Sequence, residues 1–294
     1  DSSQIPTTLL ARFAKTKVTV ALSGDAADEI FGGYNRYSVA HKYWRYLLKV
    51  PLPIRVVLKK IMLLLNAKQM HVLLGLLKES NHRDLSLKID KFLGVLEASS
   101  TQEYHLRLCS SIQKPSDYLI QGERGATEFL AQYDRLSFSD PIMQMMAVDT
   151  LHYLPTDILA KVDRAAMSNS LETRMPFLDL ELFTFASSLP THFKVSSSSK
   201  PILREMLYKR IPRDIMDRPK MGFGIPIRDW LRGPLEEWAL DLLSKSSLDK
   251  TNIFLFDSVH KLWDEHNDLN SDHSHKLWNI LMLQSWLLEK QNVY

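Results

Sequence analysis

The stretch Val18-Thr-Val-Ala-Leu-Ser-Gly-Asp-Ala-Ala-Asp-Glu-Ile-Phe-Gly-Gly-Tyr34 decides the fold class of this chain. Its first part, Val18 to Leu22, is apolar and β-branched, which predicts a buried strand that ends in a turn at Ser23-Gly24. A short helix is expected next, ended by Gly32-Gly33. A strand, a turn and a helix in this order are typical of a parallel α/β sheet, in which ligands bind outside the carboxyl ends of the strands.

Two carboxylates follow the turn, Asp25 and Asp28, and their role has two interpretations. They can face a ligand at the end of the strand. Alternatively, they can cap the helix and complement its dipole, which stabilises a helix by about 1 kcal/mol and needs no ligand. The local pattern leaves both open.

Composition excludes several classes of protein. The 294 residues carry a net charge of only +3, which is less basic than a nucleic-acid binder, and the single cysteine, Cys109, excludes an internal disulfide framework. Polar residues interrupt the most apolar run, 61–77, so no membrane span is predicted. The first residues lack the pattern of a signal peptide, and a cytoplasmic location is expected. Because the chain starts at Asp1 and not at Met, we expect it to be a fragment or a processed product.

The pattern along the chain predicts three segments. Residues 1–37 have the helix–strand–helix order of the end of an α/β core. Residues 38–139 have helical periodicity and polar links, and form a predicted helical insertion without recognisable chemistry. Residues 140–294 are a predicted helical C-terminal part, and the three segments are expected to pack as one compact unit.

The segment around Pro155 is expected to contain a helix break, after which Ile158–Ser168 forms a new helix. One face of that helix carries a polar stripe, which either faces a ligand or is an ordinary surface of i,i+4 salt bridges: Asp157, Lys161, Arg164 and Ser168. Asp163 lies at the edge of the apolar face, so we predict that it forms an ion pair with Arg174.

A second candidate element is the loop Arg218-Pro-Lys-Met-Gly-Phe-Gly-Ile-Pro226. Its glycines allow close approach of the backbone to a ligand, and Lys220 can reach a phosphate as a point charge. The alternative is an ordinary connecting loop.

Four motifs in order resemble the C-terminal part of the synthetase domain of glutamine-dependent asparagine synthetases. They are the stretch 22–34, Tyr153-Leu-Pro-Thr-Asp-Ile-Leu-Ala-Lys-Val-Asp-Arg164, Leu171-Glu-Thr-Arg-Met-Pro-Phe-Leu-Asp179 and the loop 218–226. The resemblance covers nearly the whole chain and is weakest in the middle. It implies an α/β fold of the adenine-nucleotide alpha-hydrolase (PP-loop ATP pyrophosphatase) type. We expect this chain to be predominantly α-helical, with a remnant of the parallel sheet.

The resemblance also implies chemistry. Such a domain adenylates aspartate with ATP to give β-aspartyl-AMP and pyrophosphate, and ammonia from a glutaminase domain then yields asparagine and AMP. By this resemblance Asp25 and Lys220 are catalytic, Ser23 and Gly24 touch the nucleotide, and Asp28 faces pyrophosphate and its Mg²⁺, directly or indirectly. Partners would be aspartate, ATP and ammonia, without nucleic acid or membrane, and a homodimer is possible.

Two features of that family do not occur in this sequence. The pyrophosphate loop, Ser-Gly-Gly-x-Asp-Ser, is absent, and so is the glutaminase domain with its N-terminal cysteine. The chain alone is therefore expected to lack synthetase activity.

Two alternatives stay open. A related amidotransferase or a ligase resembling β-lactam synthetase would adenylate another carboxylate with the same architecture. A helical scaffold would keep the fold and perform no chemistry, although the retention of Asp25, Asp28 and Lys220 argues against it.

Overall fold

A computed structural model describes residues 1–64, 91–121, 126–196, 199–217, 224–268 and 271–291. The chain forms two compact units, each built from several segments. The first comprises Asp1–Pro51, Ser99–His105 and Thr127–Gly224, and the second Leu52–Ala98, Leu106–Ala126 and Ile225–Tyr294. The boundaries expected from the sequence, after residues 37 and 139, stay a prediction.

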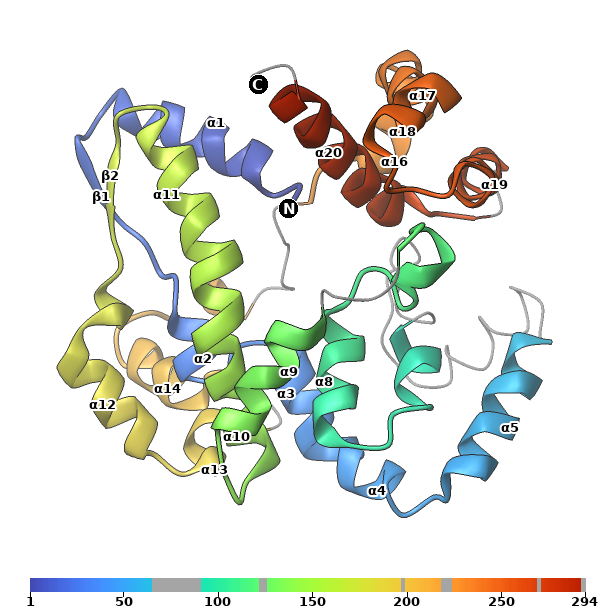
Figure 1. Ribbon diagram of the computed structural model, residues 1–294. Helices are drawn as coiled ribbons and strands as arrows, with labels where there is room; N and C mark the ends of the chain where they lie inside the picture. The colour runs from blue at the N-terminus through green and yellow to red at the C-terminus, as the bar shows by residue number, and fades with distance from the viewer. Residues whose placement is uncertain (65–90, 122–125, 197–198, 218–223, 269–270, 292–294) are drawn as a thin grey trace. The chain divides into compact units, whose positions relative to one another are not determined.

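The first unit contains a two-stranded parallel sheet. Strand β1 (Val20–Leu22) pairs with β2 (Glu172–Arg174), with Ala21 opposite Thr173. The two strands lie side by side although about 150 residues separate them in the sequence (Figure 1). Among the described residues the rest of the regular structure is helical apart from isolated bridges, which confirms the expected helical chain with a remnant of a parallel sheet.

One face of this sheet is covered and the other is exposed. Helix α1 (Gln4–Lys15) and helix α11 (Ala160–Met167) pack at the covered face, where Ala11, Ala166 and Leu171 are buried and Ala21 packs against them. Successive side chains of a strand point to opposite faces, so Val20 and Leu22 point away from these helices. Leu22 is 75% exposed. The prediction of a buried strand is therefore wrong for this face.

A continuous helical segment runs from Pro141 to Met167. It consists of α10 (Pro141–Val148), the π-helix η4 (Asp149–Leu159) and α11. The helix break predicted at Pro155 is wrong, because the proline lies inside η4. The wider π-helical turn, with its i→i+5 hydrogen bonds, accommodates a residue that has no N–H to donate without ending the helix.

The remaining elements of the first unit are helices. They are α2 (Ala27–Ile30), α3 (Asn35–Val39), η1 (Ala40–Trp44), α4 (Arg45–Leu47), α9 (Ala126–Arg135), η5 (Pro176–Leu178), α12 (Leu180–Ser188), α13 (Thr191–Lys194), α14 (Pro201–Tyr208) and α15 (Arg213–Met216). A buried cluster of Ile30, Phe31 and Ala186 joins α2 to α12. This cluster fixes the short helix that follows the turn after β1.

The second unit is helical. Its described elements are α5 (Leu52–Leu63), η3 (Pro115–Asp117), α16 (Ile227–Leu231), α17 (Glu236–Leu243), α18 (Lys245–Thr251), α19 (Phe256–Asn267) and α20 (Ser274–Gln291), and α8 (Thr101–Cys109) begins in the first unit and ends here. Leu277 and Leu281 of α20 are fully buried, and Cys109 is exposed. Among the described residues, no helix has the length and apolar character that crossing a membrane requires.

Candidate functional site at the turn after β1

The turn after β1 brings Ser23 and Asp25 together. The Ser23 N–H donates to the Arg174 carbonyl at 2.8 Å, which extends the parallel ladder by one residue, and the Ser23 hydroxyl donates to Asp25 Oδ2 at 2.5 Å. The N-cap of α2 is Ala26, which has a left-handed backbone (φ +73°) and no side-chain oxygen. The capping interpretation of Asp25 is therefore wrong, because this carboxylate turns back to Ser23 and Ala26 occupies the N-cap.

The glycines of this stretch have different roles. Gly32 has φ +67° and the Gly33 N–H donates to the Asp28 carbonyl at 2.8 Å, so the pair ends α2 as predicted. A Cβ on Gly33 would lie 1.6 Å from Asp28 Oδ1, whereas one on Gly24 would meet no atom within 4 Å. Gly33 is thus required by packing, and Gly24 leaves open space above the turn.

Asp28 has a partner that the sequence analysis missed. The Lys200 ammonium lies 2.8 Å from Asp28 Oδ1. Lys200 has a left-handed backbone (φ +52°) and is the N-cap of α14, just before Pro201. A non-glycine residue in this region carries strain, which clusters at functional sites. The signal in the sequence was a lysine directly before a proline, Lys200-Pro201.

A cavity of about 410 Å³ lies beside this turn, between α1, β1, β2 and α11. Ser23, Asp25 and Lys161 line it, together with apolar side chains of α1. The Lys161 ammonium lies 2.7 Å from Asp1 Oδ2 and 2.9 Å from Ser3 Oγ. The polar stripe therefore presents a cation to the cavity that the Asp25 carboxylate also lines.

The predicted ion pair between Asp163 and Arg174 is wrong. Asp163 is exposed, and Arg174 instead pairs with Glu172 at 2.7 Å. Because α11 turns Asp163 to solvent, its carboxylate needs no buried partner. Lys220, and with it residues 218–223 of the second candidate loop, lies outside the described residues.

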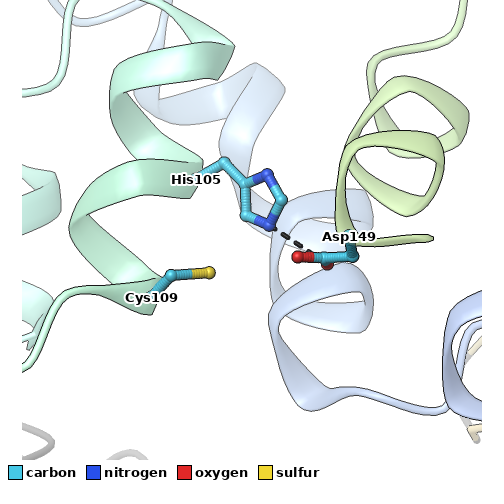
Figure 2. Close-up of side chains that lie close together, drawn as sticks. All are labelled: His105, Cys109 and Asp149. Atoms are coloured by element: carbon cyan, nitrogen blue, oxygen red, sulfur yellow. Dashed lines mark hydrogen bonds and ion pairs between the residues drawn. The ribbon is translucent and has the colours of Figure 1, made fainter. Parts of the chain in front are cut away.

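A buried polar cluster holds the segment that follows Gly33. Asp149, which is fully buried, accepts from Arg36 Nε at 2.9 Å and from the Tyr37 hydroxyl, and lies 3.1 Å from His105 Nε2. Figure 2 shows the His105 ring directed at this carboxylate. Burial acts to raise the pKa of Asp149, but His105, Arg36 and Tyr37 outweigh it and hold the pKa below its ordinary value. The cluster fixes α3 against the start of η4.

The asparagine synthase family matches residues 1–288, nearly the whole chain. The chain belongs to the asparagine synthase family. The fold of this family is the adenine-nucleotide alpha-hydrolase type, as expected from the sequence motifs.

Curated members of the asparagine synthase family are similar over nearly all of this chain. A putative glutamine-hydrolysing asparagine synthetase of Mycobacterium tuberculosis (strain ATCC 25618 / H37Rv) is 34% identical over 291 residues, which are 97% of this chain and 42% of that protein. Glutamine-hydrolysing asparagine synthetase 1 of Bacillus subtilis (strain 168) is 32% identical over 294 residues, 97% of this chain and 43% of that protein. The chain thus spans less than half the length of these relatives.

Proposed function

We propose that this chain forms one wall of the adenylation site of an asparagine synthetase. The proposed reaction joins the aspartate side-chain carboxylate to AMP at the expense of ATP, releases pyrophosphate, and then lets ammonia derived from glutamine displace AMP to give asparagine. The observation that carries the proposal is the turn itself: Ser23, Gly24, Asp25 and Asp28 lie together at the carboxyl end of a parallel strand in a chain of this family.

Ser23 and Gly24 are proposed to face the nucleotide. Gly24 supports this role because neither a positive φ nor a crowded Cβ position requires glycine there. Where the fold itself does not need a glycine, close approach of a ligand to the backbone is a reason for one. The backbone of this turn is then available to the nucleotide without an intervening side chain.

Asp25 is proposed to orient the attacking ammonia and to accept its proton. Amine attack on an acyl adenylate needs a nearby carboxylate in its ionised form. The hydroxyl of Ser23 holds the Asp25 carboxylate in place, and the same carboxylate lines the 410 Å³ cavity. A fixed orientation of the base is a requirement of this kind of catalysis.

Asp28, Lys200 and Lys220 are proposed to serve the pyrophosphate. Mg²⁺ is commonly held by one or two carboxylates together with phosphate oxygens, and Asp28 provides such a carboxylate, whose Oδ1 already has a cation beside it. When bound, Mg²⁺ would neutralise negative charge on the phosphates. The ammonium groups of Lys200 and Lys220 would stabilise the charge of the departing group.

The direct test measures two reactions of the full-length protein that contains this chain. We expect aspartate-dependent exchange of labelled pyrophosphate into ATP, and formation of asparagine with glutamine or ammonia. Asp25→Asn should lower asparagine formation at least about a hundredfold, the usual contribution of a general base. The control is Glu172→Gln on the exposed ion pair, which should keep full activity.

Two results would contradict the proposal. An unchanged rate of the folded Asp25→Asn variant would remove this residue from catalysis and favour a scaffold role for the turn. Exchange that depends on another carboxylate, with no response to aspartate, would replace asparagine synthesis by a related ligase reaction. The isolated chain is expected to show no exchange.

A further inference from the structure

A second cavity, of about 230 Å³, lies in the first unit beside α2, where α10, η4, α12 and α13 meet. It shares no lining residue with the cavity at Ser23 and Asp25. Its walls are mostly thioether, aliphatic and aromatic side chains, among them Met143, Met146 and Phe183. Phe138, which also lines it, is exposed, so the cavity reaches the surface.

One cation lies in this apolar wall. Lys194 lines the cavity and is only 2% exposed. Its ammonium has a hydrogen bond to Met143 Sδ at 3.7 Å, and a thioether sulfur is a weak acceptor. Burial of an ammonium with such a partner is costly, and it lowers the pKa of Lys194 to about 8 against a weaker opposite effect of Asp140.

The nearby carboxylate of Asp140 is already engaged. It caps α10, where it accepts from the Ile142 N–H at 2.8 Å and the Met143 N–H at 3.4 Å, and it also accepts from the Thr191 hydroxyl. Asp140 therefore attracts Lys194 at a distance and serves mainly as a helix cap. The strongest remaining partner for the ammonium would be an anion inside the cavity.

Glu29 is the other ionisable residue of the wall. It is almost completely buried and accepts from the Tyr34 hydroxyl at 2.6 Å. Burial raises the pKa of Glu29 in spite of this hydrogen bond. Lys194 is the one cation among the residues that line this cavity.

We propose that this cavity binds a small apolar monocarboxylate, with the carboxylate on the Lys194 ammonium and the hydrocarbon part between Met143, Met146 and Phe183. The volume corresponds to about eight water-sized groups at roughly 30 Å³ each. A six-carbon carboxylate such as hexanoate has this size. The site is separate from the proposed adenylation site and does not depend on it.

Calorimetric titration of the full-length protein with sodium hexanoate at pH 7 tests the proposal. We expect saturable binding of one hexanoate per chain. The neutral analogue 1-hexanol should bind at least tenfold more weakly, because it gives the ammonium no counter-charge. Lys194→Met, which keeps the length of the side chain, should weaken hexanoate binding at least tenfold, whereas the exposed control Lys209→Met should leave it unchanged.

A cavity-filling variant and a labelling measurement locate the ligand. Ala147→Phe introduces a ring into the same wall and should abolish binding while Lys194 is retained. In the wild-type protein, hexanoate should slow the acetylation of Lys194 by acetic anhydride at least threefold relative to Lys209, as followed by mass spectrometry. Because this measurement uses the wild-type protein, it does not depend on whether a variant folds.

Three outcomes would overturn the proposal. They are no binding of hexanoate to the wild-type protein at millimolar concentration, equal affinity of folded wild-type and Lys194→Met proteins, or no protection of Lys194 from acetylation. Loss of pyrophosphate exchange in the full-length protein would concern the proposed function alone.

Discussion

At the scale of single residues, burial decides what a charged side chain contributes. Asp149 is fully buried and contacts Arg36, Tyr37 and His105. In the Glu172–Arg174 ion pair, by contrast, both side chains are exposed. Breaking a buried ion pair by removing one partner costs far more than breaking one in water.

Asp149→Asn is therefore expected to lower the free energy of unfolding by about 3 kcal/mol, since it removes the negative charge that offsets Arg36. The matched control Glu172→Gln should change it by less than about 1 kcal/mol. Urea unfolding of both variants, compared with the wild type, measures this. Equal effects of the two substitutions would show that the buried cluster adds nothing beyond a surface pair.

Because Lys194 is buried, we expect the stability of the chain to change with pH in the alkaline range. Its pKa is about 8 in the folded chain and 10.5 ordinarily, so between these values the unfolded chain binds more protons. The free energy of unfolding should rise as the pH increases from 8 to 10.5, by up to about 3 kcal/mol. Urea unfolding at pH 7.5 and 10 tests this, and Lys194→Met should remove most of the rise.

At the scale of elements, the two glycines Gly24 and Gly33, near the turn after β1, are expected to respond differently to substitution. Gly33→Ala would bring a methyl group against Asp28 and is expected to lower the free energy of unfolding by roughly 1 to 3 kcal/mol, as overpacking does. Gly24→Ala meets open space, so stability should change by no more than about 0.5 kcal/mol while ATP binding weakens. Thermal unfolding and nucleotide titration of the full-length protein distinguish the two. Unchanged ATP affinity in Gly24→Ala would separate this glycine from the nucleotide.

The long helix through Pro155 shows where element prediction fails. Proline in an α-helix removes a hydrogen bond and clashes with the preceding turn, and this is the reason to expect a break. The chain instead widens to a π-helix over Asp149–Leu159, and Asp149 at its start is tied to Arg36 and His105. The continuous helix is thus accompanied by contacts between different elements. A local sequence pattern does not contain these contacts.

At the scale of the whole molecule, each of the two compact units contains a buried ionisable side chain through which its stability depends on pH. In the second unit, His266 is fully buried beside Trp263, with 6.4 Å between the ring centroids. Burial, followed by the positive charge of Arg232, lowers the pKa of His266 to about 4. Between pH 4 and 6.5 the unfolded chain therefore binds more protons, and stability is lost as the pH falls through this window.

The expected loss is roughly 2 to 3 kcal/mol on going from pH 7 to 4.5. Urea unfolding followed by tryptophan fluorescence checks it, and His266→Phe should flatten the dependence on pH. A wild-type profile that is flat between pH 4.5 and 7 would contradict the assignment.

The sequence by itself determined the family, the strand–turn–helix at Val20–Ile30 and the glycine end of α2, because these depend on motifs and on local backbone preferences. It also pointed to Ser23, Gly24, Asp25 and Asp28, which lie close together in the sequence and so lie on the turn after β1 and in the short helix α2 that follows it.

Only the tertiary structure decided the partners of these residues. It paired Asp28 with Lys200, turned Asp163 to solvent, exposed Leu22 and placed Lys194 in an apolar cavity. The physical reason is that burial and charge pairing depend on segments that are distant in the sequence, and packing between elements brings these segments together, not periodicity within them.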